Sequence, residues 1–219
     1  MSSRPALAAI VFDFDGVVLE SADLKTEAFI ELFAPHGPAV VDQVRTHHLA
    51  NLDISRFKKF EWIDANVLQQ PLSPEQSRAL GEQFSALALE KILACPFVPG
   101  AEAALAALSA RLPLFVASGT PQDELTMIVE RRGLAARFRE VWGTPREKPA
   151  ILADVMARHG WGREQVLFIG DGESDYKAAT AAGVHFLARE TAALGTRWRD
   201  LDVPRAPDLT SLVELVERW

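Results

Sequence analysis

Two aspartates, Asp13 and Asp15, stand two positions apart directly after the apolar run Leu7 to Phe12. In an extended strand, residues two apart face the same side, so both carboxylates can point into one pocket. One carboxylate could attack phosphorus, while the other protonates the leaving oxygen and later deprotonates water. Gly16 would let the chain turn sharply after the pair. The spacing therefore suits phosphoryl transfer, although an Asp-Phe-Asp-Gly segment alone also fits carboxylates that cap a helix or face solvent.

A second acidic segment, Gly170-Asp171-Gly172-Glu173-Ser174-Asp175, follows the apolar run Val166 to Ile169 and opens a helical segment. Mg²⁺ prefers oxygen ligands and keeps several of its waters, so two carboxylates, a backbone carbonyl and a substrate phosphate suffice to hold it. Asp13 and Asp171 are the expected protein ligands. Asp175 either accepts hydrogen bonds from the metal's waters or is an acid that favours the first turn of a helix, and the spacing does not separate these roles.

A hydroxyl-bearing segment, Ser118-Gly119-Thr120-Pro121, ends another apolar run, Leu112 to Ala117, and begins a helix with its threonine as the expected N-cap. A hydroxyl and free backbone N–H groups at a helix start can bind an anion, so Ser118 and Gly119 are candidates for phosphate binding. Lys148 would supply the cation that several carboxylates and a phosphate dianion require. The simpler alternatives are that Ser118 only ends a strand and that the Lys-Pro pair lies in a surface loop.

The elements that must position these residues alternate between short apolar runs and helical segments. This alternation is typical of the α/β class with a doubly wound parallel sheet. Because open α/β sheets bind ligands at the carboxyl ends of their strands, we expect the polar segments to meet at one sheet edge. The expected strands are Leu7 to Phe12, Leu112 to Ala117, Glu140 to Trp142, Val166 to Ile169 and Val184 to Leu187.

One long stretch departs from this alternation and shows helical periodicity instead. We expect a Rossmann-like α/β core made of residues 1–20 and 96–219, with residues 21–95 inserted as an α-helical cap domain. The insertion begins just after the first aspartate pair, so its two connections could act as hinges beside the site. Within it, Ser73-Pro74-Glu75-Gln76 has the spacing of a helix start with a capping box. The expected helices span residues 24–33, 40–49, 55–68 and 74–93.

Composition narrows the classes of partner. The 219 residues carry 23 Lys and Arg against 30 Asp and Glu, a formal net charge of -7, and no basic stripe, which argues against nucleic-acid binding. Cys95 is the only cysteine, so no intrachain disulfide forms, and we expect it to be a small buried residue. No apolar run is long enough to span a bilayer or to serve as a signal peptide. We expect a cytoplasmic protein that has no membrane partner.

Taken in this order, the four segments resemble the haloacid dehalogenase (HAD) superfamily, and the resemblance covers essentially the whole chain, including an insertion of the helical cap type. In that family the motifs supply a nucleophile, a general acid/base, a phosphate-binding hydroxyl, a charge-balancing lysine and an acidic pair that holds Mg²⁺. The resemblance implies these roles for Asp13, Asp15, Ser118, Lys148, and Asp171 with Asp175, in that order. It also implies that the Asp15 carbonyl is a further metal ligand.

The second aspartate separates branches of that family. Its dehalogenases lack an Asp there, and its phosphonate-cleaving members carry a small residue, so Asp15 argues against both. Mutases of the β-phosphoglucomutase kind keep both aspartates but usually carry a His near the position of Lys25. The resemblance thus favours a Mg²⁺-dependent phosphomonoester hydrolase acting on a small phosphorylated metabolite, with phosphoglycolate phosphatase as the nearest named activity. A sugar-phosphate mutase and a non-catalytic binding module are the alternatives.

Two basic residues of the insertion are candidates for substrate specificity. The segment Asn51-Leu52-Asp53-Ile54-Ser55-Arg56 resembles the family's specificity loop, and Arg56 could bind a carboxylate or second phosphate of the substrate in a bidentate manner. Lys25 could do the same as a point charge. For both, a solvated helix face or loop is an equally good interpretation. The expected assembly is a monomer or a homodimer.

Overall fold

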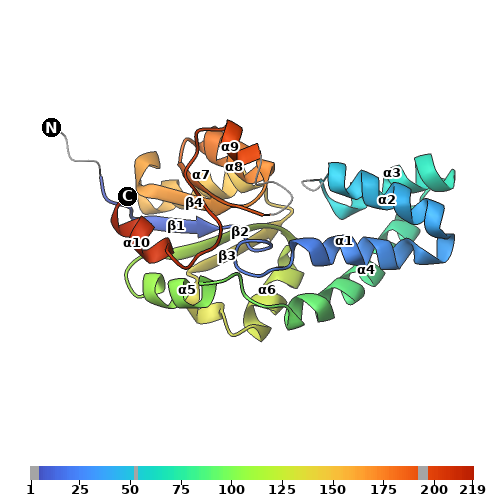
Figure 1. Cartoon of the computed structure of the whole chain (residues 1–219), viewed down its shortest axis with the longest axis horizontal. Coiled ribbons are helices and arrows are strands. Elements are labelled where there is room, and N and C mark those ends of the chain that lie inside the picture. The colour runs from blue at the N-terminus through green and yellow to red at the C-terminus, as the bar shows by residue number, and fades with distance from the viewer. Residues whose placement is uncertain (1–4, 52–53, 192–196) are drawn as a thin grey trace. The chain divides into compact units, whose positions relative to one another are not determined.

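The computed structural model describes residues 5–51, 54–191 and 197–219, except the side chains of residues 197 and 199 (Figure 1). The chain divides into two compact units. The first contains Met1–Glu20 and Pro96–Trp219, and the second contains Ser21–Cys95. We call them the core unit and the helical unit and describe each by itself.

A parallel sheet forms the centre of the core unit, as the alternating pattern predicts. Over the described residues it has six strands in the order β3-β2-β1-β4-β5-β6, and every paired strand is parallel. The strands are β1 (Ala9–Phe12), β2 (Leu114–Pro121), β3 (Glu140–Thr144), β4 (Val166–Gly170), β5 (His185–Arg189) and β6 (Arg205–Ala206). The short β6 has no counterpart among the predicted strands, because two residues show no periodicity. The doubly wound α/β class is thus confirmed.

The strand order reverses direction between β1 and β4. From β1 the chain adds β2 and β3 on one side, and then β4, β5 and β6 on the other. Phe12, the last residue of β1, pairs with Val116 of β2 and with Ile169 of β4. Ligands of open α/β sheets bind at such a switch point, beyond the carboxyl ends of the strands. The residues that follow Phe12 and Ile169 therefore start at the favoured position.

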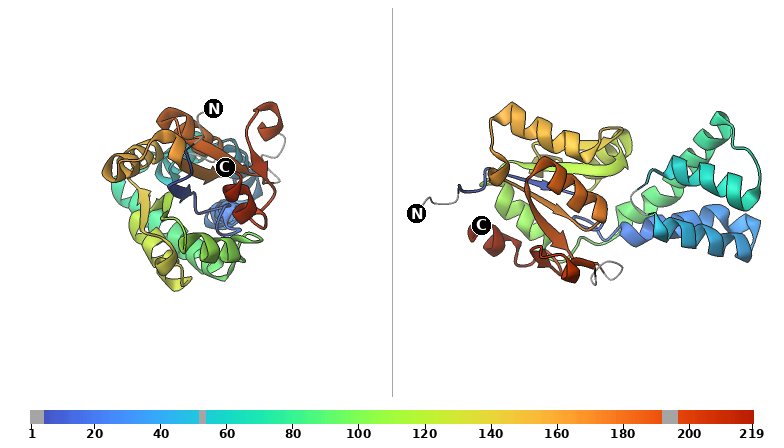
Figure 2. Two further views of the ribbon diagram at one scale, coloured as in Figure 1. Left: turned by 90° about the vertical axis from the view of Figure 1, so that its left-hand side faces the viewer. Right: turned by 90° about the horizontal axis from the view of Figure 1, so that it is seen from above.

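Helices cover both faces of the sheet, with α7 and α8 on one face and α5, α6 and α10 on the other (Figures 1 and 2). Apolar side chains of β1, β2 and β4 pack with Ile151, Leu152 and Val155 of α7 and with Ala178 and Ala179 of α8. The helices are α5 (Ala101–Ser109), α6 (Gln122–Arg131), α7 (Lys148–His159), α8 (Glu173–Ala182), α9 (Arg197–Asp200) and α10 (Leu212–Glu217), with short 3₁₀ turns at Ala135–Arg137 and Arg163–Gln165.

The helical unit is built around aromatic side chains. Phe29 packs against Phe84 and Phe60, with ring centroids 4.7 Å and 5.6 Å apart. The capping box at Ser73 is confirmed, because Gln76 N–H donates to Ser73 Oγ and Ser73 N–H donates to Gln76 Oε1. The elements are α1 (Ala22–Phe33), a 3₁₀ turn (Ala34–His36), α2 (Pro38–Ala50), α3 (Arg56–Ile63), a π-helical turn (Asp64–Leu68) and α4 (Pro74–Ala94).

Two smaller expectations, one for the helix over residues 55–68 and one for Cys95, can be compared with these elements. The single helix expected over residues 55–68 is interrupted, because the chain changes to a π-helical turn after Ile63. Phe57 and Trp62 are 42% and 39% exposed, and the Phe57 ring packs edge-on against that of Phe60, with ring centroids 6.1 Å apart. Cys95 is buried, as expected, and its thiol donates to the Ile92 carbonyl. Among the described residues, none of the helices combines the length and apolar character needed to cross a bilayer.

Candidate active site

Asp13 and Asp15 emerge from β1 at the switch point. The Asp13 N–H donates to the Ile169 carbonyl of β4 at 2.8 Å, which continues the ladder of hydrogen bonds for one residue beyond the strand. Asp13 is buried, and its Oδ1 accepts from the Phe14 N–H at 2.7 Å. Phe14 itself is fully buried, so the alternation that sends both aspartates away from the core holds here.

A tight turn follows the two aspartates. Gly16 has a φ of 74°, in the left-handed region where glycine is favoured, and its N–H donates to the Leu19 carbonyl at 2.8 Å. The Phe14 carbonyl accepts from Val18 N–H at 2.9 Å. The chain therefore turns away directly after Asp15, which leaves that side chain at the strand end.

The acidic segment after β4 lies against Asp13. Carboxylate oxygens of Asp13, Asp171 and Asp175 all lie within 4.8 Å of one another. Asp175 is 1% exposed and accepts a hydrogen bond from the Gly172 N–H at 3.0 Å. A Cβ added to Gly170 would stand 2.3 Å from the Asp175 Cβ, so only glycine fits where β4 ends. Asp175 is thus held inside the cluster and does not merely face solvent at a helix start.

Lys148 is the cation of this cluster. Its Nζ lies 3.0 Å from Asp13 Oδ2 and 2.5 Å from Asp175 Oδ1, and only 14% of its side chain is exposed. Burial opposes the charged ammonium, but the attraction of Asp13 and Asp175 outweighs burial and raises the pKa of Lys148 above its ordinary value. Lys148 therefore stays protonated at neutral pH. The simpler interpretation of Lys148-Pro149 as a surface loop does not hold.

For Asp13 and Asp171, burial and repulsion outweigh the attraction of the neighbouring charge of Lys148. Burial, repulsion by Asp175 and repulsion by Asp15 outweigh the attraction of Lys148 and raise the pKa of Asp13 to about 7. Burial raises the pKa of Asp171 well above its ordinary value, and the charges of Asp13 and Asp175 add to the effect. Among the described residues, one ammonium thus faces three carboxylates. A positively charged ligand with oxygen preference would restore the balance.

Ser118 and Thr120 approach the aspartates from β2. The side chain of Ser118 is buried, and its Oγ accepts from the Thr120 N–H at 3.1 Å. Thr120 Oγ1 donates to Asp15 Oδ2 at 2.8 Å. A Cβ added to Gly119 would meet nothing within 4 Å, so the space beside this exposed residue is open to a small ligand.

The role expected for Thr120 as a helix cap is wrong. Strand β2 continues to Pro121, and α6 begins only at Gln122 with Pro121 in the capping position. The residue before a proline is driven toward extended backbone, and Thr120 therefore remains in the strand. Because residues two apart in a strand share a face, Ser118 and Thr120 both point to the site. That spacing was the signal by which the contact between Thr120 and Asp15 could have been found.

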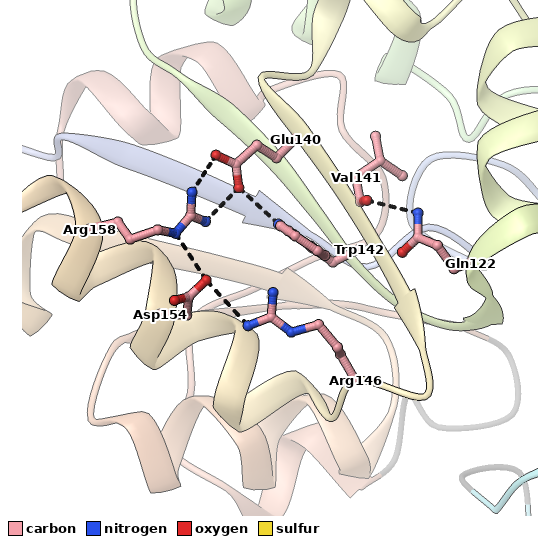
Figure 3. A network of polar contacts seen from close by, with 7 residues as sticks. All are labelled: Gln122, Glu140, Val141, Trp142, Arg146, Asp154 and Arg158. Carbon is pink, nitrogen blue, oxygen red and sulfur yellow. Dashed lines mark hydrogen bonds and ion pairs between the residues drawn. The ribbon is translucent and has the colours of Figure 1, made fainter.

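A polar network fixes the loop that presents Lys148 (Figure 3). Arg158 of α7 binds Glu140 of β3 through two hydrogen bonds, of 2.6 Å and 2.5 Å, and donates to Asp154 at 2.9 Å. Arg146, two residues before Lys148, pairs with Asp154 at 3.2 Å, and its guanidinium lies 4.3 Å from the Trp142 ring centroid. Strand β3, the loop and helix α7 are thereby joined just where Lys148 begins the helix.

Another contact secures the strands beside this loop. Gln122, the first residue of α6, donates from Nε2 to the Val141 carbonyl at 3.1 Å (Figure 3). Its Oε1 accepts from the Gly143 N–H at 2.7 Å. A Cβ on Gly143 would lie 2.4 Å from the Thr120 carbonyl oxygen, so β2 and β3 approach closely here. The segments that carry Thr120 and Lys148 are therefore braced against each other.

Comparison with known proteins identifies the family of this chain. The family model described as haloacid dehalogenase-like hydrolase matches residues 7–183. The chain belongs to the haloacid dehalogenase-like hydrolase family. A phosphoglycolate phosphatase of Synechococcus elongatus is 27% identical over 183 residues, which cover 81% of each chain.

Solved structures of similar fold cover almost the whole chain. CbbY from Rhodobacter sphaeroides, in complex with phosphate, has a TM-score of 0.72 at 19% identity and covers 94% of this chain and 96% of its own. YfnB from Bacillus subtilis, bound to magnesium, has a TM-score of 0.71 at 14% identity, with 97% and 100% covered. At these identities the likeness establishes the haloacid dehalogenase fold of this chain.

The candidate specificity residues of this haloacid dehalogenase-like hydrolase make contacts within the helical unit. Arg56 NH1 donates to Ser85 Oγ at 2.7 Å, and its guanidinium lies 4.5 Å from the centre of the Phe84 ring. Lys25 is half-buried on α1 and is close enough to His48 to help lower the pKa of that histidine. Within the loop that ends at Arg56, residues 52 and 53 lie outside the described residues. A role for Arg56 or Lys25 in substrate binding stays a prediction.

Proposed function

We propose that this haloacid dehalogenase-like hydrolase is a phosphatase that hydrolyses a small phosphorylated metabolite, with Mg²⁺ and through an aspartyl-phosphate on Asp13. The observation that carries the proposal is the cluster itself, in which Lys148 bridges Asp13 and Asp175 while Asp171 completes a group of three carboxylates. The phosphoglycolate phosphatase names of the relatives support the same class of reaction.

The donor set fits a divalent cation. Among the described residues, three carboxylates within 4.8 Å of one another face a single ammonium, and burial together with their mutual repulsion raises the pKa values of Asp13 and Asp171. All of the donors are oxygens, the ligand type that Mg²⁺ prefers. In the proposal Asp13, Asp171 and the Asp15 carbonyl hold the ion, and Asp175 orients its waters. When bound, Mg²⁺ would offset charge on the phosphoryl oxygens.

The first chemical step is assigned to the two aspartates of β1. An Asp13 oxygen attacks phosphorus, and the bond between phosphorus and the ester oxygen breaks. Asp15 donates its proton to that leaving oxygen, so an alcohol departs and an aspartyl-phosphate remains. Thr120 Oγ1 donates to Asp15 Oδ2 at 2.8 Å, and this bond would orient the carboxyl group that transfers the proton.

The second step regenerates the enzyme. Asp15, now a carboxylate, takes a proton from water, and the water oxygen attacks phosphorus. The bond between phosphorus and the Asp13 oxygen breaks and releases inorganic phosphate. Ser118 and the open backbone at Gly119 would bind phosphoryl oxygens throughout, and Lys148 would balance the charge of Asp13 in both steps. This accounts for each residue of the cluster with a separate task.

Phosphate release tests the proposal. The parent protein is assayed on a panel of small phosphate esters that includes phosphoglycolate, with Mg²⁺ or with a chelator, beside Asp13→Asn. Asp123→Asn, which changes an exposed aspartate of α6, is the matched control. We expect Mg²⁺-dependent turnover in the parent and the control and none in Asp13→Asn. Turnover that survives in Asp13→Asn, or in chelator, contradicts the proposal.

A second variant separates the two steps. With p-nitrophenyl phosphate the leaving group is weakly basic and needs little protonation, whereas the attacking water still needs a base. Asp15→Asn is therefore expected to release one p-nitrophenolate per active site rapidly and then to turn over slowly. A linear time course without a burst would argue against a covalent intermediate. Strong activation of sugar-phosphate isomerisation by a bisphosphate would instead identify a mutase.

A further inference from the structure

The C-terminal part of the core unit contacts the turn that follows the two aspartates. Arg189, the last residue of β5, is 9% exposed and has a guanidinium that reaches across to residues near the start of the chain. Its NH1 donates to the Gly16 carbonyl at 3.2 Å, and its NH2 donates to Glu20 Oε1 at 2.5 Å. One guanidinium therefore holds both ends of the turn from Gly16 to Glu20.

The bond from Arg189 to the Gly16 carbonyl acts on the turn directly after Asp15. The Gly16 N–H is already bound to the Leu19 carbonyl, so the bond from Arg189 fixes the second polar backbone group of the same residue. The Gly16 carbonyl belongs to the peptide between Gly16 and Val17. With that peptide held by Arg189 and φ at 74°, the Gly16 N–H stays directed at the Leu19 carbonyl, and this second bond orients the peptide between Asp15 and Gly16. That peptide carries the Asp15 carbonyl, and its position also sets where the Asp15 side chain begins.

The geometry requires an arginine. A guanidinium presents several N–H donors in a rigid plane and can bind two acceptors in different directions, whereas a lysine ammonium on a flexible stem acts as a point charge. The side chain of Glu20 is 34% exposed, but that of Arg189 is only 10% exposed. Removing Arg189 would thus leave the Gly16 carbonyl without this partner, while Glu20 could still be solvated.

The C-terminal region also contacts the segment by which the chain returns from the helical unit. Inside the core unit the turn pairs with the returning chain, since Glu20 N–H donates to the Pro96 carbonyl at 3.0 Å. Beyond that pair, the Leu209 N–H donates to the Pro99 carbonyl at 2.9 Å. A Cβ on Gly100 would stand 2.3 Å from the Thr210 backbone nitrogen. Both segments that lead to the helical unit are thus braced by the C-terminal region.

We propose that Arg189 is a positioning residue for the reaction, holding the turn after Asp15 so that the Asp15 carbonyl and carboxyl stay in their working places. This inference rests on the proposed phosphatase function. A purely structural role is the alternative, in which Arg189 only stabilises the fold. The two roles predict different results. If Arg189 positions the turn, its replacement speeds amide exchange in the turn and lowers kcat by more than a general loss of stability would.

The experiment compares Arg189→Met and Arg189→Lys with a matched control, Arg205→Met. Arg205 lies in the same region, pairs with a glutamate, Glu190, at 3.3 Å and donates to the Trp198 carbonyl, and neither contact involves the turn. Amide hydrogen exchange is measured on the metal-free proteins, and Mn²⁺ affinity and p-nitrophenyl phosphate kinetics follow on the same samples. If Arg189→Met does not fold, Glu20→Gln removes the charge pair from the exposed side and takes its place.

We expect Arg189→Met to speed exchange of the amides of residues 16–19 without affecting β2, and to weaken Mn²⁺ binding. Small displacements of reacting groups cost up to about a hundredfold, so kcat should fall by about tenfold to a hundredfold while KM changes little. Arg189→Lys should recover only part of this loss, and Arg205→Met should match the parent. Unchanged exchange in the turn, or faster exchange with unaltered kcat, overturns the inference.

These outcomes remain distinct from failure of the proposed function. If the parent releases no phosphate from any ester, the phosphatase proposal fails, and the exchange and Mn²⁺ measurements alone decide the role of Arg189. Faster exchange of residues 16–19 with weaker Mn²⁺ binding then still supports positioning of the turn. A drop in melting temperature with neither change overturns it and leaves Arg189 as a structural residue.

Discussion

Replacing Asp171 by asparagine should stabilise the metal-free protein and remove its response to Mg²⁺. Asp171 lies in a cluster whose carboxylate oxygens are within 4.8 Å of one another. At an effective dielectric constant of about 20, two full charges at that separation repel by about 3 kcal/mol. Burial and the neighbouring aspartates raise the pKa of Asp171, while the attraction of Lys148 offsets part of the repulsion. The net gain from Asp171→Asn is therefore smaller, on the order of 1 kcal/mol.

Mg²⁺ should reverse the order of the melting temperatures of the parent and Asp171→Asn. A ligand present at a hundredfold excess over its dissociation constant stabilises the folded state by about 2.7 kcal/mol. For a chain of this size that corresponds to a rise in melting temperature of roughly 5 to 10 °C. Asp171→Asn lacks one of the proposed ligands and should show little of this rise. The variant is thus expected to melt above the parent in chelator and below it in Mg²⁺.

Thermal melting in chelator and across a Mg²⁺ titration measures both effects. Glu173→Gln is the control, because Glu173 lies two residues further on and pairs with Lys177 at 3.3 Å but does not belong to the cluster. It should respond to Mg²⁺ as the parent does. The reasoning is refuted if Asp171→Asn melts below the parent in chelator, or if Mg²⁺ raises its melting temperature as much as that of the parent.

Three further predictions concern packing and charge. Gly170→Ala should displace Asp175, because the new Cβ would lie 2.3 Å from that residue, and phosphate release should fall at least tenfold with a smaller change in melting temperature; normal release would contradict this. Burial and neighbouring lysines lower the pKa of His48 from 6.5 to about 3, so the unfolded chain takes up a proton below about pH 6.5 that the folded chain does not. Below that pH, urea denaturation should show the free energy of unfolding falling by about 1.4 kcal/mol for each unit by which the pH is lowered. His48→Gln should reduce this slope. Arg158 lowers the pKa of Glu140 to about 2, so Arg158→Met should be less stable than the parent above about pH 5, and the difference should disappear as the pH falls toward 2. A difference that is independent of pH would mean that Arg158 acts by packing alone.

The fold class could be predicted because apolar runs of strand length alternate with helical segments along the chain. The strands β1 and β4 are buried on both faces, and such strands appear in a sequence as continuous apolar runs. Helix starts with strong local signals, such as the capping box at Ser73, were equally accessible. Strand β6 was not, since Arg205 and Ala206 join the sheet only because β5 offers an edge.

The sequence predicts site residues best where a residue type that can do chemistry also stands at the end of an expected strand. Asp13 and Asp171 follow the carboxyl ends of β1 and β4, and Ser118 lies in the last half of β2. Parallel strands end at one edge of the sheet. Thr120 was misassigned because the local pattern of a hydroxyl before proline suggests a helix cap, whereas the proline in fact keeps it in the strand.

The amino-acid sequence by itself determined the alternation of elements, the helical insertion and the residue types that can meet at the sheet edge, because all of these depend on local periodicity and on strand polarity. Only the tertiary structure decided the pairing of Lys148 with both Asp13 and Asp175, the hydrogen bond from Thr120 to Asp15 and the contact of Arg189 with Gly16. The last two contacts join residues 105 and 173 positions apart. Such contacts arise when helices and strands pack, and the burial that packing brings also sets the pKa values of the site.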